Sequence, residues 1–349
     1  MSKTNTQVIF KQDPGAGWVE PSHMEVKKTT FDPDTVELKE GDVLVKVLYL
    51  SLDPYMRGRM NTSKARYINS FEVGKPMQGG GVSQVYRVGG RSEYAKGDIV
   101  VGFVGWEEWS VIPGGKGLKK LDTSLPVPLS YYLGILGMPG QTAYCGLIKL
   151  GEPKPGETVY VSGAAGAVGL VVGQIAKAKG CYVVGSAGSD DKVKVLLEEA
   201  GYDAAFNYKT VESFDKALTQ YCPKGIDVYF DNVGGEMLDA ALAHMNVHGR
   251  IPVCGGISQY NVETPYGVKN LLEVIGKRIK IQGFMVGDFW ADTELMKNFG
   301  KDMTAWVKEG KIVYKEQIDE GLESAPEAFV GMLKGRNTGK QIVKVADRD

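Results

Sequence analysis

The sequence predicts a two-part α/β protein, with a mainly antiparallel β domain and a domain built on a doubly wound parallel sheet. Short strand patterns separated by glycines and turn residues fill the chain to about residue 136, and strand character returns near its C-terminus. Between these regions, strand and helix patterns alternate. We therefore expect one domain from residues 1–136 and 305–349 and a second from residues 137–304. A chain of 349 residues is long enough for two cores of ordinary size.

The first domain is expected to be mainly antiparallel because its apolar runs are short and are bounded by turn residues. Its predicted strands cover residues 42–50, 81–85, 97–103 and 108–112. The stretch 338–345 again has strand character, so we expect the end of the chain to rejoin this domain.

The second domain shows the alternation of strands and helices that is typical of a parallel sheet. Its predicted strands cover residues 158–161, 182–185, 204–207, 226–231, 249–254 and 279–283. Helical patterns lie between them, among them residues 190–200, 212–221 and 235–244. This number and order of elements favour a doubly wound sheet of the Rossmann type.

A glycine-rich turn follows the first strand of the second domain. It reads Gly163-Ala-Ala-Gly166-Ala-Val-Gly169, and the apolar residues after it have helical spacing. Small residues at such a turn let the backbone approach a pyrophosphate, and the N–H groups at a helix start favour negative charge. The spacing G-x-x-G-x-x-G departs from the usual dinucleotide pattern. A turn that merely packs the helix against the strand is therefore the alternative interpretation.

The end of the second strand of this domain indicates which dinucleotide would bind. A site for NAD normally has an Asp or Glu there, which accepts the ribose hydroxyl. This chain has the small, uncharged stretch Ser186-Ala-Gly-Ser189, and Lys192 is the nearest cation. We therefore expect NADP(H), although Asp190 and Asp191 stand in between and Lys192 could be a solvated surface lysine.

The composition argues against several classes of partner. The chain has 41 basic and 42 acidic residues, so neither nucleic acid nor an anionic membrane surface is expected to bind. We find no signal-peptide pattern and no apolar run long enough to span a bilayer. The four cysteines are scattered without C-x-x-C pairs, which favours free thiols in a cytoplasmic protein.

A metal site is not expected. His244 and His248 have a spacing that could present two imidazoles on one helix face, but a third ligand and an H-E-x-x-H context are missing. The stretch from Asn246 to Gly249 looks like the end of a helix.

Several motifs, in order along nearly the whole chain, resemble one known family. They are Leu52-Asp-Pro-Tyr-Met-Arg57, Gly137-Met-Pro-Gly-Gln-Thr-Ala-Tyr144, Ala165-Gly-Ala-Val-Gly169, Phe206-Asn-Tyr-Lys209, Asp231-Asn-Val-Gly-Gly235 and Gly335-Arg-Asn-Thr-Gly-Lys340. The chain is similar to the zinc-free medium-chain dehydrogenase/reductases, and within them to the NADPH-dependent alkenal double-bond reductases. That branch includes plant alkenal reductases, prostaglandin reductases and bacterial curcumin reductases. The resemblance implies a Rossmann-type nucleotide domain, a GroES-like catalytic domain and a homodimer.

The resemblance also assigns residues to the NADP(H) site. Those expected at the pyrophosphate turn are Gly163, Ala165, Gly166 and Val168, and those expected at the ribose phosphate are Gly188, Lys192 and Tyr208. The remaining expected contacts are Asn232, Cys254, Gly255, Phe284, Val286 and Asn337. Alternatives stay open for three of these residues: Tyr208 could be a core tyrosine, and the two asparagines could be local turn residues.

Tyr260 is the predicted catalytic residue, because it lies in a long, polar, glycine-rich loop after the fifth strand. The implied reaction delivers hydride to the β-carbon of an α,β-unsaturated aldehyde or ketone. The Tyr260 hydroxyl would then hydrogen-bond the enolate oxygen. The alternative is an exposed loop aromatic without a catalytic role.

The first domain is expected to supply the substrate contacts Tyr55, Arg57 and Tyr67, with Trp106 as a weaker suggestion. An aromatic pocket would suit flat conjugated substrates such as alkenals, phenylpropenals and benzalacetone-type enones. Arg57 could instead form a structural ion pair with Asp53 of the same motif. Aromatic residues in a β domain also often belong to the core.

Two other classes of function remain open. One is a related oxidoreductase, either a zinc-free quinone reductase or an enzyme acting on a lipid mediator. The other is a non-catalytic NADPH-binding protein, since a fold alone does not prove activity. The zinc-dependent members of the family carry a Gly-His-Glu motif, and this chain has Pro76-Met-Gln-Gly-Gly-Gly81 at the comparable place.

Overall fold

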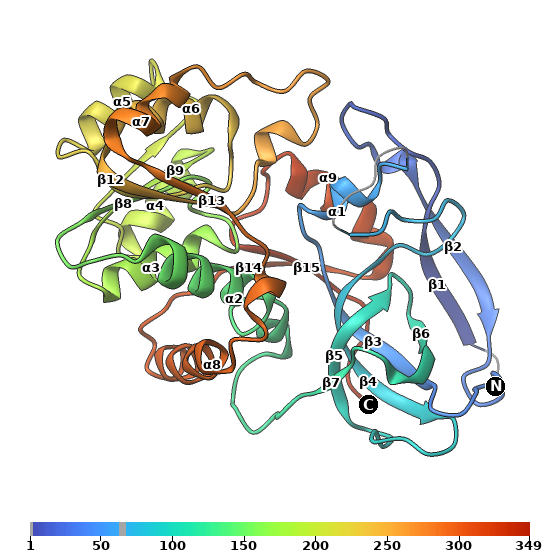
Figure 1. Ribbon diagram of the computed structural model, residues 1–349. Coiled ribbons are helices and arrows are strands. Elements are labelled where there is room, and N and C mark those ends of the chain that lie inside the picture. Colours follow the sequence, from blue (N-terminus) through green and yellow to red (C-terminus); the bar gives the residue numbers. More distant parts are fainter. Residues whose placement is uncertain (1–2, 63–67) are drawn as a thin grey trace. The chain divides into compact units, whose positions relative to one another are not determined.

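The computed structural model describes residues 3–62 and 68–349 and divides into two compact units (Figure 1). Unit 1 comprises Met1–Gly134 with Glu316–Asp349, and unit 2 comprises Ile135–Lys315. The predicted boundary after residue 304 falls inside a helix that runs from Thr293 to Lys308. The segment beyond this helix also bonds within unit 2, where the N–H of Val313 donates to Gln174 at 2.7 Å. Unit 2 therefore extends to Lys315.

Unit 1 is built mainly from antiparallel strands, as predicted. In its described residues, β1 (Lys3–Phe10) pairs with β2 (Met24–Phe31), and a second sheet has the order β14-β15-β3-β4-β5-β7, with β6 paired to β3. These strands are β3 (Val43–Ser51), β4 (Gln78–Val88), β5 (Ile99–Gly105), β6 (Trp109–Ile112), β7 (Lys119–Lys120), β14 (Glu316–Glu320) and β15 (Lys340–Lys344). The helices are α1 (Met56–Arg59) and α9 (Ala325–Leu333), with short 3₁₀ turns η1 (Pro21–His23), η2 (Pro113–Gly115), η3 (Leu129–Leu133) and η8 (Leu322–Ser324).

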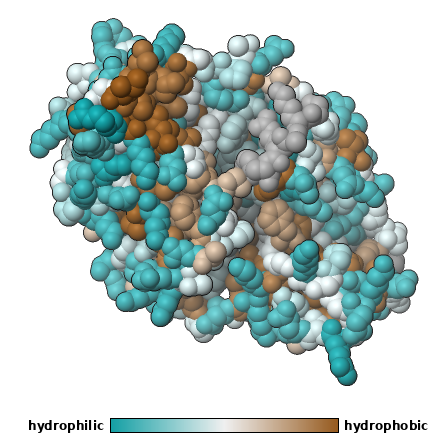
Figure 2. Space-filling model, in the orientation of Figure 1, coloured by the Kyte–Doolittle hydropathy of each residue, from teal (hydrophilic) through white to brown (hydrophobic). Residues whose placement is uncertain are grey.

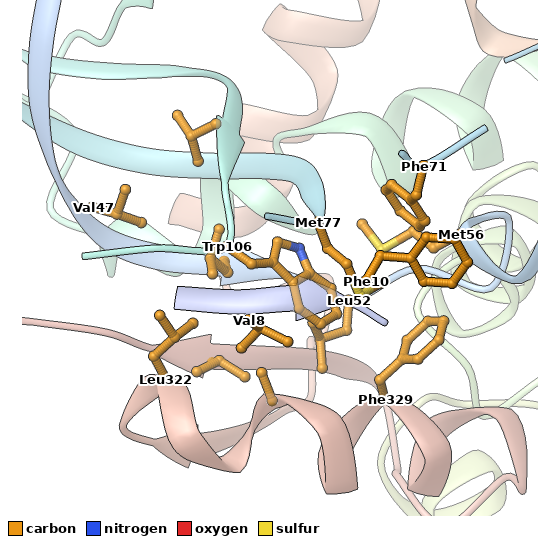
Figure 3. Packing of buried hydrophobic residues seen from close by; sticks show 14 of the residues in the cluster. Val8, Phe10, Val47, Leu52, Met56, Phe71, Met77, Trp106, Leu322 and Phe329 are labelled. Carbon is orange, nitrogen blue, oxygen red and sulfur yellow. The ribbon is translucent and has the colours of Figure 1, made fainter. Parts of the chain in front are cut away.

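A large apolar cluster lies in the interior of unit 1 (Figure 3). Trp106 is fully buried in this cluster, and its ring packs edge-to-face against that of Phe329, with 5.8 Å between the two ring centroids. Side chains from β1, β3 and α9 surround this pair, because these elements place apolar residues on their inner faces. Trp106 is therefore a core residue, in line with the structural interpretation of aromatic residues in this domain.

Unit 2 contains a doubly wound parallel sheet, which confirms the predicted fold class. Within residues 135–315, all of which the structure describes, six strands have the order β10-β9-β8-β11-β12-β13. They are β8 (Thr158–Val161), β9 (Tyr182–Ala187), β10 (Ala204–Asn207), β11 (Ile226–Phe230), β12 (Met245–Val253) and β13 (Lys280–Gly283). The chain order reverses between β8 and β11, and open parallel sheets bind ligands at such a switch point.

The helices of unit 2 precede, connect and follow these parallel strands in the chain. They are α2 (Met138–Cys145), α3 (Gly169–Ala178), α4 (Asp190–Glu198), α5 (Phe214–Tyr221), α6 (Gly235–His244), α7 (Glu273–Lys277) and α8 (Thr293–Lys308). Shorter helical turns are η4 (Gly146–Gly151), η5 (Ile257–Gln259), η6 (Asn270–Leu272) and η7 (Val286–Phe289). Beneath the sheet, the rings of Tyr160 and Tyr229 stack at 5.0 Å, and Phe206 continues this stack. The middle strands thus carry bulky buried side chains that fix their spacing.

The region after α6 differs from its prediction. The helix ends at His244, and β12 begins at once at Met245, so the stretch from 246 to 249 is strand and not a helix end. His248 has φ of 64° at an irregularity in the pairing of β12 with β11. Because His244 and His248 lie on different elements, they do not share a helix face. The His244 Nε2 atom instead contacts Asp215 Oδ1 at 2.8 Å.

Residues 3–62 and 68–349 contain neither a candidate metal-binding cluster nor a candidate membrane-spanning helix. No group of three or more His, Cys, Asp or Glu side chains in this part of the chain is arranged to hold a metal ion. Among the same residues, no helix is long and apolar enough to cross a membrane.

Candidate functional site in unit 2

The loops that follow β8, β11 and β12 are hydrogen-bonded to one another at the carboxyl edge of the sheet. The side-chain amide of Asn232 donates to the Ser162 carbonyl at 2.8 Å. The N–H groups of Cys254 and Gly255 donate to the Asp231 carbonyl at 2.8 and 3.1 Å. Ser162 and Asn232, 70 positions apart in the sequence, are thus brought together at the switch point. The predicted residues Asn232, Cys254 and Gly255 lie in this cluster.

The glycine turn after β8 is tight and leads directly into α3. Gly163 has φ of 59°, a conformation that glycine adopts without strain. A Cβ atom on Gly169 would lie 2.5 Å from the Gly163 carbonyl oxygen, so the helix start needs a residue without a side chain. No side chain of the described residues caps the N-terminus of α3. The positive end of the α3 dipole therefore suits an anionic ligand, and the predicted Ala165, Gly166 and Val168 lie in this turn.

A second group of predicted residues meets at the end of β9. A Cβ atom on Gly188 would lie 2.9 Å from the Tyr208 hydroxyl oxygen, so the ring of Tyr208 lies directly against this glycine. Lys192 is half-buried on α4, one turn after Ser189, whose Oγ accepts the Lys192 N–H at 3.4 Å. Gly188 and Tyr208 are thus in contact, Lys192 follows on the next helix, and the role of all three at a ribose phosphate stays a prediction.

Lys209 adds a cation that was not predicted as a site residue. Its Nζ atom lies 5.9 Å from the centroid of the Tyr208 ring. Burial, and then the charge of Lys209, lower the pKa of Lys192. A bound anion would offset the unfavourable effect of burial and of Lys209 on the charge of Lys192. Asp190, which complicated the sequence argument, accepts the Asn207 amide at 2.8 Å and lies in the first turn of α4.

Asp231 is a buried carboxylate that sequence reasoning missed. It has no exposed surface, and its Oδ1 atom accepts the Tyr229 hydroxyl at 2.6 Å and the N–H groups of Val233 and Gly234 at 2.9 and 2.8 Å. Its Oδ2 atom has no partner among the described residues. Burial raises the pKa of Asp231 against the effect of these hydrogen bonds. The carboxylate fixes the turn that carries Asn232.

Tyr260 reaches back over the strand-end cluster. Its hydroxyl accepts the Gly256 N–H at 3.4 Å, and a Cβ atom on Gly255 would lie 3.3 Å from the same oxygen. Tyr260 as a whole is only partly buried. Burial, and to a lesser extent Asp231, raise the pKa of the neighbouring Cys254 thiol to about 12, so that thiol is protonated at neutral pH. Because an S–H group is a weak hydrogen-bond donor, the phenol of Tyr260 is the stronger donor of the two.

Phe284 and Val286 follow β13, as predicted, but the Phe284 ring has partners inside unit 2. Its centroid lies 6.1 Å from that of Phe230 and 5.9 Å from that of Phe289. A Cβ atom on Gly146 would lie 2.4 Å from this ring. The side chain of Phe284 thus packs in the unit, and its main chain is what could face a ligand. Val286 begins the short helix η7.

The predicted residues of unit 1 form bonds within that unit. Arg57 is buried and donates to the carbonyl oxygens of Gly15 and Gly17 at 2.7 and 2.8 Å. Asp53 forms a buried ion pair with Lys340 at 3.2 Å. The alternative considered from the sequence, an ion pair between Asp53 and Arg57, therefore named the wrong partner for Asp53.

The other predicted residues of unit 1 are less informative. Tyr55 precedes α1, and its role in substrate binding stays a prediction. The Asn337 amide donates to the Gly339 carbonyl at 2.7 Å, which is a local turn bond. Tyr67 lies outside the described residues.

Comparisons with known proteins agree with this architecture. Residues 6–121 match the family model described as the N-terminal domain of oxidoreductase, and residues 167–301 match the one described as zinc-binding dehydrogenase. The chain is 50% identical over 345 residues to an NADP(+)-dependent 2-alkenal reductase of Nicotiana tabacum, which covers 98% of both chains. It is 44% identical to the NADPH-dependent curcumin reductase of Escherichia coli, over 91% of this chain and 92% of that protein.

A solved structure extends the comparison to the fold. The structure of CurA from Vibrio vulnificus in complex with NADPH superposes with a TM-score of 0.89 at 37% identity, covering 98% of this chain and 99% of that one. Both halves of the chain are therefore similar to one group of relatives. The chain belongs to the medium-chain dehydrogenase/reductase family, in the branch of NADPH-dependent alkenal and curcumin reductases that these relatives represent.

Proposed function

We propose that this protein is an NADPH-dependent reductase of the carbon–carbon double bond of α,β-unsaturated aldehydes and ketones. The observation that supports it most is the gathering of three features at one edge of the unit 2 sheet. They are the glycine turn before α3, the group formed by Gly188, Lys192 and Tyr208, and the hydroxyl of Tyr260. The names of the 2-alkenal and curcumin reductases support the same reaction class.

The residues at this edge fit NADP(H). The Gly163 turn and the uncapped start of α3 suit a pyrophosphate, because they present backbone N–H groups without side chains in the way. At the end of β9, Lys192 and Lys209 suit the ribose phosphate that distinguishes NADPH from NADH. Because β9 ends in the small residue Ala187, no carboxylate at that position would repel this phosphate.

The residues of this chain would act by binding, orienting and stabilising charge. The chemistry that bound NADPH supplies is hydride donation, here to the β-carbon of the enone. Negative charge then develops on the carbonyl oxygen, and the Tyr260 hydroxyl would donate a hydrogen bond to it. A proton added at the α-carbon completes the saturated product. One such donor is worth about 3 kcal/mol, so correct positioning of both reactants must supply most of the acceleration.

We further propose that the reaction needs no zinc ion. Stabilising an enolate requires a hydrogen-bond donor, whereas exchanging hydride with a simple alcohol usually requires a Lewis acid. Two of the three histidines have other partners: His244 contacts Asp215, and the Nδ1 atom of His23 accepts the Glu20 N–H at 2.8 Å. Full activity after dialysis against a chelator, with no zinc found by elemental analysis, is the expected result. Loss of activity that zinc restores would contradict this proposal.

A homodimer is the proposed assembly. The exposed side chains of Leu271, Leu272 and Ile275 are 57%, 78% and 74% accessible, and they lie at or beside α7. Figure 2 shows an apolar patch in the region where Figure 1 labels this helix. The edge strand β13 has exposed side chains and pairs only with β12 among the described strands. Monomers seldom expose such a patch beside an open strand edge, so a second copy is a suitable occupant.

The cytoplasm is the proposed location. The four cysteines are free and mostly buried, which suits a reducing compartment.

The experiment that tests the proposed function follows NADPH oxidation with an alkenal, a cinnamyl-type enal, benzalacetone and a quinone, with each substrate also tried with NADH. Mass spectrometry identifies the products. A saturated aldehyde or ketone, formed with a preference for NADPH, is the expected result. Turnover of the quinone alone would favour a quinone reductase. Tight NADPH binding without any turnover would indicate a binding protein.

A further inference from the structure

The loop that carries Tyr260 is attached to α6 through one buried carboxylate. Asp239 lies in the middle of α6 and is 5% exposed. Its Oδ1 atom accepts the N–H groups of Lys269 and Asn270 at 2.8 and 2.7 Å, and its Oδ2 atom accepts the Tyr266 hydroxyl at 3.0 Å. The Asn270 side chain also donates to the Asp239 carbonyl at 3.0 Å. This one residue thus fixes the far end of loop 256–270.

A chain of hydrogen bonds continues from this anchor to Tyr260. The Tyr266 N–H donates to Gln259 Oε1 at 2.7 Å, and Gln259 Nε2 donates to Ser258 Oγ at 2.8 Å. The Ser258 hydroxyl in turn donates to the Val233 carbonyl at 2.6 Å. Gln259 directly precedes Tyr260, so the position of the Tyr260 ring depends on both ends of the loop.

The contacts of Asp239 suit an ionised carboxylate. Burial opposes its ionisation, but the donated bonds from Asn270, Tyr266 and Lys269 outweigh burial and lower the pKa of Asp239. Hydrogen bonds to an ionised acceptor are stronger than those between neutral groups. An amide at this position could keep both N–H groups on its oxygen, but its NH₂ group would have to donate to the Tyr266 hydroxyl, and all three bonds would lose the strengthening that an ionised acceptor gives.

We propose that Asp239 is a positioning residue for the reaction, because its carboxylate holds loop 256–270 so that the Tyr260 hydroxyl stays over Gly255 and Gly256. This inference rests on the proposed function, in which Tyr260 donates to the enolate oxygen. Asp239 acts only through Tyr260 and takes no direct part in binding NADPH.

A double-mutant cycle tests this inference on the whole protein. The variants are Asp239→Asn, Tyr260→Phe and the pair together, each assayed for NADPH-dependent reduction of benzalacetone. We expect Asp239→Asn to lower kcat about tenfold with an NADPH Kd within about twofold of the wild type, because a displaced donor loses part of its effect. In the Tyr260→Phe background the same change should have no further effect, since there is no hydroxyl left to misplace.

Additive losses would overturn the inference, because they would show that Asp239 acts independently of Tyr260. An unchanged kcat with a lowered Tm would overturn it as well, since Asp239 would then serve stability alone. A normal rate for Tyr260→Phe would refute the catalytic role in the proposed function, and the inference with it. A wild-type protein that reduces no enone would refute the proposed function at an earlier step.

Two further variants keep the result interpretable. Tyr266→Phe removes only one bond to Asp239, and it replaces Asp239→Asn in the cycle if that variant does not fold. It must show a smaller loss of kcat than the one expected for Asp239→Asn. In the Tyr260→Phe background this loss must again vanish. Asp203→Asn is the matched control. Asp203 also accepts a backbone N–H, from Val183 at 2.7 Å, and it pairs with Lys177, but neither partner belongs to loop 256–270. This control must leave kcat unchanged.

Discussion

At the scale of single residues, the hydroxyl of Tyr260 is the group on which the proposed chemistry depends. Replacing Tyr260 by Phe removes the donor and keeps the ring, so we expect kcat/KM for enones to fall about 100-fold while NADPH binding is retained. Steady-state kinetics with benzalacetone and fluorescence titration of NADPH measure the two effects. Tyr182→Phe, at an exposed tyrosine of β9, serves as the control. A loss below about twofold would remove Tyr260 from the mechanism.

A second prediction at the scale of single residues concerns Lys192. Replacing it by Ala should raise the KM for NADPH about 10- to 100-fold and leave the KM for NADH unchanged, because only NADPH carries the ribose phosphate. Lys194→Ala is the matched control, since Lys194 lies on the same helix and is exposed. If both cofactors are affected equally, Lys192 supports α4 and does not select the phosphate.

The pH dependence of this binding follows from the same lysine. Because burial and Lys209 lower the pKa of Lys192, its charge is lost at a lower pH than that of an ordinary lysine. The affinity for NADPH should therefore fall as the pH rises through this lowered pKa, and Lys192→Ala should abolish that fall. Titrations of NADPH binding between neutral and alkaline pH measure it, with NADH as the comparison.

Sequence reasoning identified some residues of the candidate site and missed others. Tyr208 was proposed from a motif that directly follows a strand, whereas Lys192 was proposed as the nearest cation after the second strand and Tyr260 from the glycine-rich loop after the fifth. Asp231 and Asp239 were missed, although Asp231 begins one of the quoted motifs. Their importance lies in buried hydrogen bonds to residues distant in the sequence, and no spacing rule reports the burial of an aspartate.

At the scale of elements, the two glycines Gly169 and Gly300 should respond oppositely to a methyl group. A Cβ atom on Gly169 would lie 2.5 Å from the Gly163 oxygen and 2.7 Å from Ala164 Cα, so Gly169→Ala must displace the turn before α3. We expect a stability loss of about 1–3 kcal/mol and weaker NADPH binding. Gly300 lies within α8 with nothing within 4 Å of its would-be Cβ, so Gly300→Ala should add about 1 kcal/mol.

Urea unfolding followed by circular dichroism measures both changes, and the alanine in α8 is the control for the one before α3. Stabilisation by both substitutions would mean that the turn at Gly163 tolerates displacement. The close approach of α3 to this turn would then have no role in shaping the site.

Element boundaries were predictable where apolar periodicity is strong and less so where strands follow helices directly. The residues of β8, β10 and α6 have the predicted bounds. The start of β12 at Met245 was not expected, because its first residues are polar and irregularly paired, and His248 adopts a left-handed conformation there. Tertiary pairing with β11 therefore overrides a local pattern that resembles a helix end.

At the scale of the whole molecule, the predicted division into two units follows from the switch between strand-only and alternating patterns. The second boundary lies at Lys315 because α8 is continuous to Lys308 and the segment after it bonds to Gln174. The charges of the side chains along the sequence do not indicate where this boundary lies. The boundary depends on which unit α8 packs against, and this packing exists only in the folded chain.

Self-association is the prediction that belongs to this scale. Leu272 is 78% exposed beside α7, and a charged side chain at the centre of an isologous contact would face its own copy. Leu272→Glu should therefore shift the protein from dimer to monomer in sedimentation velocity. Val73→Glu, at a residue of unit 1 that is 57% exposed, should leave the dimer intact. Because assembly stabilises the folded state, the wild-type Tm should rise with protein concentration, whereas that of Leu272→Glu should not. A wild-type protein that sediments as a monomer at all concentrations would leave the apolar patch at α7 without the partner proposed for it.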